Sequence, residues 1–134
     1  MNKIMFFEKK SKFSFDDTVT KVSEAAKKNG WHVPDIRDLQ KVYQEAGHKD
    51  MTKLKTIALC KPHGAYKILN YDKNKRLAAM MPIQLAVYER KNGEVYVSGM
   101  NIGFMGKMFG GIIKEVMNEG AIDIKKTLYG IIKK

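Results

Sequence analysis

Apolar residues recur at helical spacing along the segment 15–29, directly after a polar cap. Ser14 has the side chain of an N-cap residue, and Asp17 follows at the position that completes such a cap. Gly30 suits the position just after the last turn. The apolar stripe consists of Phe15, Val19, Val22 and Ala26. The pattern predicts an amphipathic helix over residues 15–29, with one face against a core.

Two later segments alternate in the manner of strands. Residues 83–88 and 95–100 each place apolar side chains at every second position. Asn92 and Gly93 lie between them, and this dipeptide is typical of tight hairpin turns. We therefore predict an antiparallel hairpin over residues 83–100.

The remaining elements are expected to be shorter. Strands are predicted over residues 4–13, 31–36 and 56–60, and helices over 38–46, 62–69 and 112–118. Residues 72–76 are charged and predict a loop, and Gly120 is expected to end the last helix before a basic tail. The residues expected to face inward from the two middle helices are Leu39, Val42 and Tyr43, and Ala65, Tyr66 and Leu69.

Strands and helices in this order predict one α+β domain over residues 1–134. The C-terminal segment, about residues 105–134, is a helical extension that we expect to pack on the sheet or on a partner subunit rather than to lie on an anionic membrane. The apolar hairpin and this extension carry more nonpolar surface than a lone small sheet covers. A symmetric homodimer is therefore expected.

Composition fits an ordinary globular domain. The chain has 134 residues, of which 44% are hydrophobic. A single cysteine excludes an intrachain disulfide and fits a reducing compartment. The apolar run over residues 4–7 is too short for a signal peptide or a spanning helix, and no later stretch is long enough. We expect a soluble cytoplasmic protein without a transmembrane segment.

The formal net charge of +11 raises the question of an anionic partner. Lysine supplies 22 of the 25 cationic residues, and arginine occurs only at Arg37, Arg76 and Arg90. Base readout and bidentate phosphate contacts rely on arginine, and the lysines here are scattered, in pairs at most. A solvated basic surface is the simpler interpretation, and nucleic acid is not the expected partner.

The segment 57–66 carries the strongest chemical signal, because it contains the only cysteine. Apolar residues precede Cys60, and Pro62 suits the first turn of a helix, so Cys60 is expected where a strand meets a helix N-terminus. The positive end of a helix favours a thiolate. With His63, Cys60 could form a nucleophile, a redox centre or half of a metal site. The alternative is a small buried core cysteine beside a solvated histidine.

One chain does not supply a complete zinc site, although a dimer could provide Cys60 and His63 twice. Methionines form a second candidate feature, at Met80, Met81, Met100, Met105 and Met108. They could line a pocket for an apolar or planar ligand such as haem. Adaptable packing in the core is the alternative, and we favour it.

Two motifs together carry a family resemblance. The first is Cys60-Lys61-Pro62 with Ala65-Tyr66, and the second is Met80-Met81-Pro82 running into the hairpin. A helix that starts Phe15-Asp16-Asp17 precedes them. The arrangement resembles the family catalogued as domain of unknown function 302, whose motif reads Cys-Asn-Pro followed later by Leu-Pro-Cys. The resemblance covers about residues 13–100.

This resemblance implies a small α+β domain in which helices pack on a curved antiparallel sheet, in a TATA-binding-protein-like arrangement that is usually dimeric. It implies no established reaction. The second motif cysteine corresponds to Ile83 in this chain, which argues against dithiol chemistry or a two-thiolate metal site.

From these observations we predict a homodimer that binds a small ligand or a metal in a groove near Cys60. The candidate ligand-binding residues are Cys60, Pro62, His63, Tyr66 and Met81, with Cys60 and His63 as the metal ligands. A thiol-dependent enzyme or redox protein that uses Cys60 and His63 is the alternative. A module that interacts through its basic surface is the third interpretation.

Overall fold

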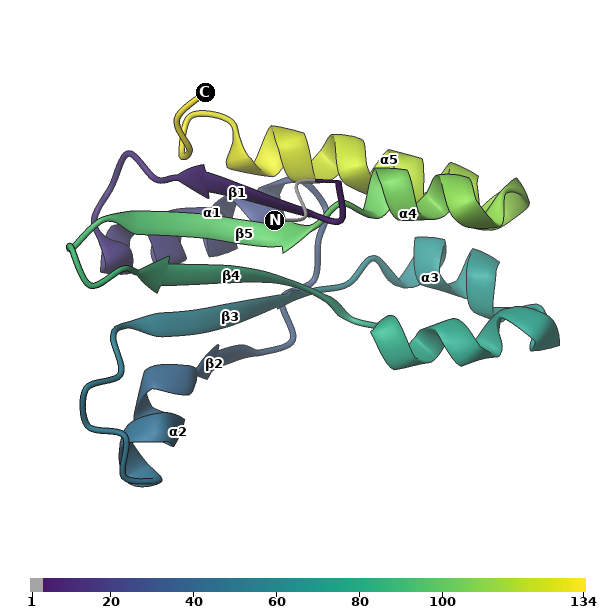
Figure 1. Ribbon diagram of the computed structural model, residues 1–134. Coiled ribbons are helices and arrows are strands. Elements are labelled where there is room, and N and C mark those ends of the chain that lie inside the picture. The colour runs from purple at the N-terminus through teal and green to yellow at the C-terminus, as the bar shows by residue number, and fades with distance from the viewer. Residues whose placement is uncertain (1–3) are drawn as a thin grey trace.

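Five strands form one antiparallel sheet in the order β1-β5-β4-β3-β2 in the computed structural model, which describes residues 4–134 (Figure 1). The strands are β1 Phe6–Lys10, β2 Ile36–Asp38, β3 Leu54–Leu59, β4 Ile83–Glu89 and β5 Val95–Met100. The helices are α1 Phe15–Lys28, α2 Leu39–Glu45, α3 Pro62–Leu69, the 3-10 helix η1 Asp72–Met80, α4 Ile102–Phe109 and α5 Gly111–Leu128. The predicted α+β class is confirmed.

Helix α1 forms as its sequence predicts. The Ser14 side chain accepts a hydrogen bond from the Asp17 N–H at 3.2 Å, and Asn29 caps the other end. Gly30 follows with φ of +86°, a conformation that residues with a Cβ rarely adopt. The buried face comprises Phe15, Thr18, Val19, Val22, Ser23 and Ala26. The apolar stripe of α1 therefore covers one face of the sheet.

The hairpin of β4 and β5 supplies the centre of that face. Val87 pairs with Val97, and Leu85 pairs with Gly99, so their side chains lie on the same side of the sheet. All of these positions are buried, and the residues between them are not. The main core joins them to Ile57 and Leu59 of β3, to the stripe of α1, and to Ile102, Ile124 and Leu128. The predicted hairpin is confirmed.

Several predicted strand and loop boundaries are wrong. The strand predicted over residues 4–13 covers only Phe6–Lys10. The strand predicted over 31–36 is reduced to an isolated bridge between His32 and Cys60, and β2 begins only at Ile36, because Pro34 has no N–H to continue the ladder. The loop predicted over 72–76 lies inside η1, whose buried positions Asn74 and Leu77 share one side of a 3-10 turn.

The predicted inward faces of two helices are wrong in part. In α2, Val42 and Tyr43 are exposed to 49% and 42%, because this helix packs near the edge of the sheet, where no second layer covers it. In α3, Tyr66 is 66% exposed, and Ile68 is the buried residue. Ile68 joins Leu77 and Ile113 in a second, smaller core cluster beside the main one.

Helices α4 and α5 replace the short helix predicted over 112–118. Gly120 does not end the last helix, since α5 continues to Leu128. A Cβ at Gly120 would lie 3.1 Å from Ile102 Cδ1 and 3.7 Å from Trp31, so the glycine allows close packing there and does not mark a break. Among residues 4–134, no helix is both long and apolar enough to cross a membrane.

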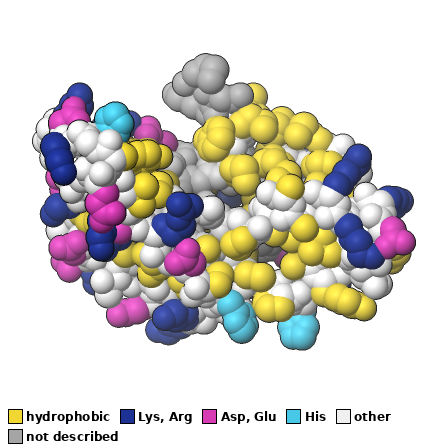
Figure 2. Space-filling model, turned by 90° about the horizontal axis from the view of Figure 1, so that it is seen from below, with side chains coloured by type: hydrophobic (Ala, Val, Ile, Leu, Met, Phe, Trp, Pro, Cys, Tyr) yellow, Lys and Arg dark blue, Asp and Glu magenta, His cyan; other side chains and the backbone are white. Residues whose placement is uncertain are grey.

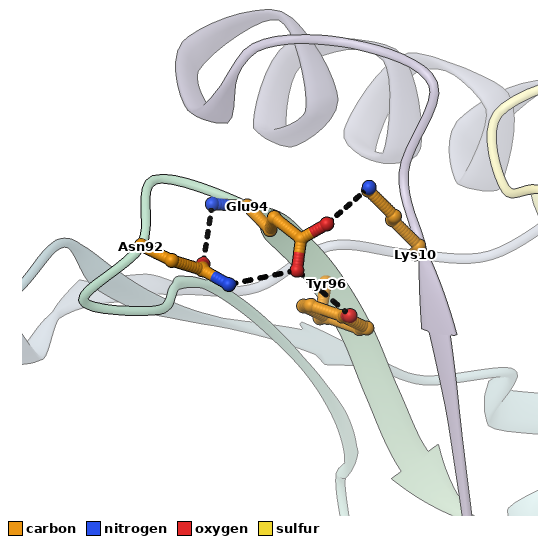
Figure 3. Close-up of polar contacts among 4 residues, drawn as sticks. All are labelled: Lys10, Asn92, Glu94 and Tyr96. Atoms are coloured by element: carbon orange, nitrogen blue, oxygen red, sulfur yellow. Dashed lines mark hydrogen bonds and ion pairs between the residues drawn. The ribbon is translucent and has the colours of Figure 1, made fainter.

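The face of the sheet opposite α1 carries charged and aromatic side chains. Figure 3 shows Glu94 as the centre of one group, where it pairs with Lys10 and accepts hydrogen bonds from Asn92 at 2.9 Å and from the Tyr96 hydroxyl at 3.4 Å. In a neighbouring group, Glu8 accepts from Tyr88 and, at 2.7 Å, from Arg90. Paired partners of this kind allow charges to remain on the sheet surface with little loss of stability.

Tyr88 makes the stability of the fold depend on pH. Burial, followed by the hydrogen bond to Glu8, raises the pKa of Tyr88 from 10.0 to about 12. Because the fold favours the neutral phenol, this contribution to stability is fully present below pH 10.0 and is lost as the pH rises through about 12. In Glu8→Gln, the pKa of Tyr88 should fall toward 10.0 but stay above it, because burial is the larger cause.

An NMR titration of the Tyr88 ring carbons measures this pKa directly. Glu94→Gln is the matched control, because Glu94 contacts Lys10 and Tyr96 rather than Tyr88. The control should leave the pKa of Tyr88 where it is in the unmodified chain. If the pKa of Tyr88 does not change in Glu8→Gln, the hydrogen bond from Tyr88 to Glu8 does not contribute to the shift.

Candidate functional site

A pocket of about 370 Å³ lies beside Cys60, where the ends of β3 and β4 meet α3, α4 and α5. We call it the Cys60 pocket. Residues of the main core, such as Trp31 and Leu59, line one part of it, and Ile68 and Leu77 of the second cluster line another. The volume lies in the range of about 300–1,000 Å³ that is common for small-molecule sites.

The inner walls of the Cys60 pocket are apolar. Four methionines contribute to them, from η1, its C-cap, the end of β5 and α5. These are Met80, Met81, Met100 and Met117. Of the other methionines in the candidate cluster, Met105 is buried and Met108 is 61% exposed, and neither lines the pocket. Unbranched methionine side chains adapt to irregular shapes, so these walls can adjust to a bound molecule.

Backbone hydrogen bonds fix the position of Cys60. Its N–H donates to the His32 carbonyl at 2.9 Å, and its own carbonyl accepts from the His32 N–H at 2.8 Å. The next residue, Lys61, is the N-cap of α3, and Pro62 is its first helical residue. Cys60 is a free, half-buried thiol at this junction of strand and helix. The predicted local structure at Cys60 is therefore confirmed.

Lys61 joins α3 to α5 at the rim of the pocket. Its ammonium group pairs with the Asp123 carboxylate and lies 4.8 Å from the centre of the Trp31 ring. The two charged side chains are 29% and 25% exposed, so water screens the pair only in part. Glu119 of α5 and Lys67 of α3 also line the pocket. The two lysines and the two acidic residues cancel in formal charge.

Trp31 lines the Cys60 pocket and carries a buried hydrogen-bond donor. The residue is only 6% exposed, and its indole N–H is buried without an acceptor among residues 4–134. A buried donor without a partner is unfavourable by roughly 1–3 kcal/mol. An acceptor atom that reached this N–H would remove that penalty.

The structure brings most of the predicted site residues together. Cys60, Pro62, His63 and Met81 line the same pocket, whereas Tyr66 does not and lies exposed on α3. Ile83, the position of the second motif cysteine, also lines the pocket, since it follows Pro82 and pairs with Leu59 at the end of β3.

Sequence reasoning missed four of the lining residues that define its chemistry. They are Trp31, Lys61, Met117 and Asp123. Trp31 is the only tryptophan and directly follows the glycine that ends α1, which is a usable signal. Lys61 and Asp123 are 62 positions apart, so no local sequence pattern predicts their ion pair.

No group of three or more histidine, cysteine, aspartate or glutamate side chains that could hold a metal ion occurs in the described part of the chain. Cys60 and His63 would supply at most two ligands from one chain. A closed structural zinc site needs four ligands, so a metal bound here would have to recruit the others from a second chain or from solvent.

Comparisons with known proteins agree with this fold. No curated protein matches the chain. The structure is similar to the crystal structure of an uncharacterized conserved protein DUF302 from Bacillus stearothermophilus, with a TM-score of 0.82 and 20% sequence identity, over 94% of this chain and 97% of that one. At this identity the likeness concerns the fold. The family model described as Domain of unknown function DUF302 matches residues 7–134, and the chain belongs to that family.

Proposed function

We propose that the Cys60 pocket binds a small, mainly apolar and uncharged molecule. The observation that carries this proposal is a methionine-rich pocket of about 370 Å³ whose charged lining residues cancel in formal charge, with Lys61 paired to Asp123. Because Lys61 is engaged by Asp123, an ion that entered the pocket would have to compete with that pair. A neutral molecule needs no such exchange.

Trp31 narrows the class of molecule further. Its unpartnered indole N–H favours a ligand that carries one hydrogen-bond acceptor, such as a carbonyl or ether oxygen. The apolar body of the ligand would then contact the methionine walls, where the four flexible side chains accommodate a planar or a branched shape. A metal held by Cys60 and His63 is the weaker form of this proposal, because one chain offers too few ligands.

The first test uses Trp31 as a reporter, since it is the only tryptophan and lines the pocket. The neutral fluorophore N-phenyl-1-naphthylamine should bind and receive excitation energy from Trp31. Ala65→Leu places a larger side chain on the pocket wall and should weaken this binding by about tenfold, which is about 1.4 kcal/mol.

Tyr66→Leu is the matched control on the same helix. Tyr66 is exposed and outside the pocket, so this variant should bind the fluorophore like the unmodified chain. Equal weakening in both variants, with the fold intact by circular dichroism, contradicts the assignment of the site.

A second test concerns Cys60 itself. The half-buried thiol lines the pocket, so iodoacetamide should alkylate it in the folded protein. The fluorophore at ten times its dissociation constant should slow this reaction by about tenfold, because only the free protein reacts. Mass spectrometry of the alkylated peptide gives the rate.

Cys60→Ala separates the binding proposal from the thiol-dependent alternative. If the pocket serves binding, the variant should still bind the fluorophore. His63 lines the same pocket as Cys60. If the Cys60 thiol reacts together with His63, the unmodified protein should form a covalent adduct with a bound molecule or convert it, and the variant should do neither although it still binds the fluorophore. If iodoacetamide does not alkylate Cys60 in the folded protein, Cys60 is neither an accessible residue of the pocket lining nor a reactive thiol.

We also infer that the protein is a homodimer, as the family resemblance implies. Large apolar side chains are exposed beside the free edge of β2, namely Ile36, Val42 and Tyr43. Figure 2 shows hydrophobic side chains spread widely over one face of the molecule. Burying such a patch against its symmetric copy is the commonest way to close an assembly.

The five-stranded antiparallel sheet with its helices also supports the TATA-binding-protein-like arrangement.

Light scattering at micromolar concentration should give twice the chain mass of 15.3 kDa. Val42→Glu places a charge in the exposed apolar patch and should shift the mass toward that of one chain. Thr20→Glu, on the exposed side of α1, is the control and should remain dimeric. A single-chain mass for the unmodified protein refutes this inference.

A further inference from the structure

A second pocket of about 510 Å³ lies between β1 and the C-terminal half of α5, and residues 130–134 border it. It shares only Met100 and Ile102 with the Cys60 pocket. We propose that this second pocket binds an alkyl carboxylate, that is, a single hydrocarbon chain with an anionic end, taken up as a free molecule. No part of this proposal depends on the function of the Cys60 pocket.

The floor of the second pocket is apolar and held in place by the fold. Ile124 and Leu128 of α5 belong to the main core and are only 6% and 2% exposed. Phe7 of β1 packs against the same core. These residues offer a hydrocarbon chain a contact surface that exists before any ligand arrives, so little ordering is needed on binding.

The rim carries one sign of charge. Five lysines line the second pocket, and no acidic side chain does. They are Lys9, Lys12, Lys125, Lys133 and Lys134. None of these lysines forms an ion pair with an acidic residue among residues 4–134. The contrast with the Cys60 pocket is direct, because there the lysine at the rim is already paired.

The position of Lys9 is the most specific evidence. Side chains alternate along a strand, so Phe7 and Lys9 project from the same side of β1. Their partners in β5 are Gly99 and Val97, which are buried, so this is the side that faces the core. A cation thus lies next to an aromatic ring at the margin of the core. An amphipathic anion could contact the ring with its hydrocarbon chain and the cation with its charged end.

Backbone pairing brings the other lysines to this place. The Lys133 N–H donates to the Lys10 carbonyl at 2.8 Å, and the Lys12 N–H donates to the Ile131 carbonyl at 2.9 Å. The C-terminal segment is thereby tied alongside the end of β1. Cations from two distant regions of the sequence, residues 9–12 and 125–134, consequently surround one apolar hollow.

Decanoate, below its micelle concentration, is the probe. In a two-dimensional amide NMR titration it should shift the signals of Lys125, Gly130 and Ile132, which line this pocket, more than those of Cys60 and Ala65. Decan-1-ol has the same chain without the charge, and butyrate has the charge with a short chain. Each should bind at least about tenfold more weakly than decanoate, because each lacks one of the two complementary parts.

Matched double variants separate the pocket from the overall charge. Lys9→Gln/Lys125→Gln removes two cations from the rim and should weaken decanoate binding by about tenfold, because it removes two exposed pairs of modest strength each. Lys41→Gln/Lys73→Gln removes the same net charge from exposed sites outside both pockets and should leave binding unchanged. Denaturation curves confirm that all variants are folded.

Three results overturn the proposal. Equal weakening by both double variants would show that only net charge matters. Shifts confined to the Cys60 pocket would place the molecule elsewhere. Association of the protein with vesicles of phosphatidylglycerol, sensitive to Lys9→Gln/Lys125→Gln, without binding of monomeric decanoate, would assign the lysines to a membrane surface instead.

Discussion

The close approach of α4 to α5 is the constraint on which the shape of both pockets depends. Gly106 of α4 has no side chain at a point where a Cβ would lie 2.9 Å from Met117 Cβ and 3.2 Å from the Lys114 backbone. Only a glycine allows the helices to meet at this distance. The contact orients α5 so that Met117 and Asp123 face α3 across the Cys60 pocket. The same helix forms the floor of the second pocket.

The ion pair of Lys61 with Asp123 affects the Cys60 pocket in two ways. It links the N-cap of α3 to α5, and it places the lysine ammonium over the Trp31 ring. A pair that is only partly buried contributes little to stability. Its main effects are therefore to hold the Lys61 side chain in place and to neutralise its charge. The pair leaves Lys61 satisfied, whereas the indole N–H of Trp31 is buried without an acceptor among residues 4–134.

Local signals in the sequence were sufficient where local physics decides the structure. The cap at Ser14 and the turn at Asn92 and Gly93 act within a few residues, so α1 and the β4–β5 hairpin were predictable. The junction at Cys60 followed from Pro62 in the same way. The prediction for Gly120 was wrong, because the reason for a glycine there is contact with Ile102, a residue of another helix. The pocket itself is assembled from tertiary contacts of this kind, which no local pattern contains.

The charge of the chain illustrates the same distinction. In the sequence, the lysines occur singly or in pairs, and their sum indicates no particular partner. Folding then places the lysines in different environments. Lys61 is paired with Asp123, whereas Lys9 and Lys125 line the second pocket, whose lining contains no acidic side chain. Electrostatic attraction depends on such local arrangement far more than on net charge, because water and salt screen charges beyond about 10 Å. The two pockets, which share Met100 and Ile102, thus differ in the charge of the side chains that line them.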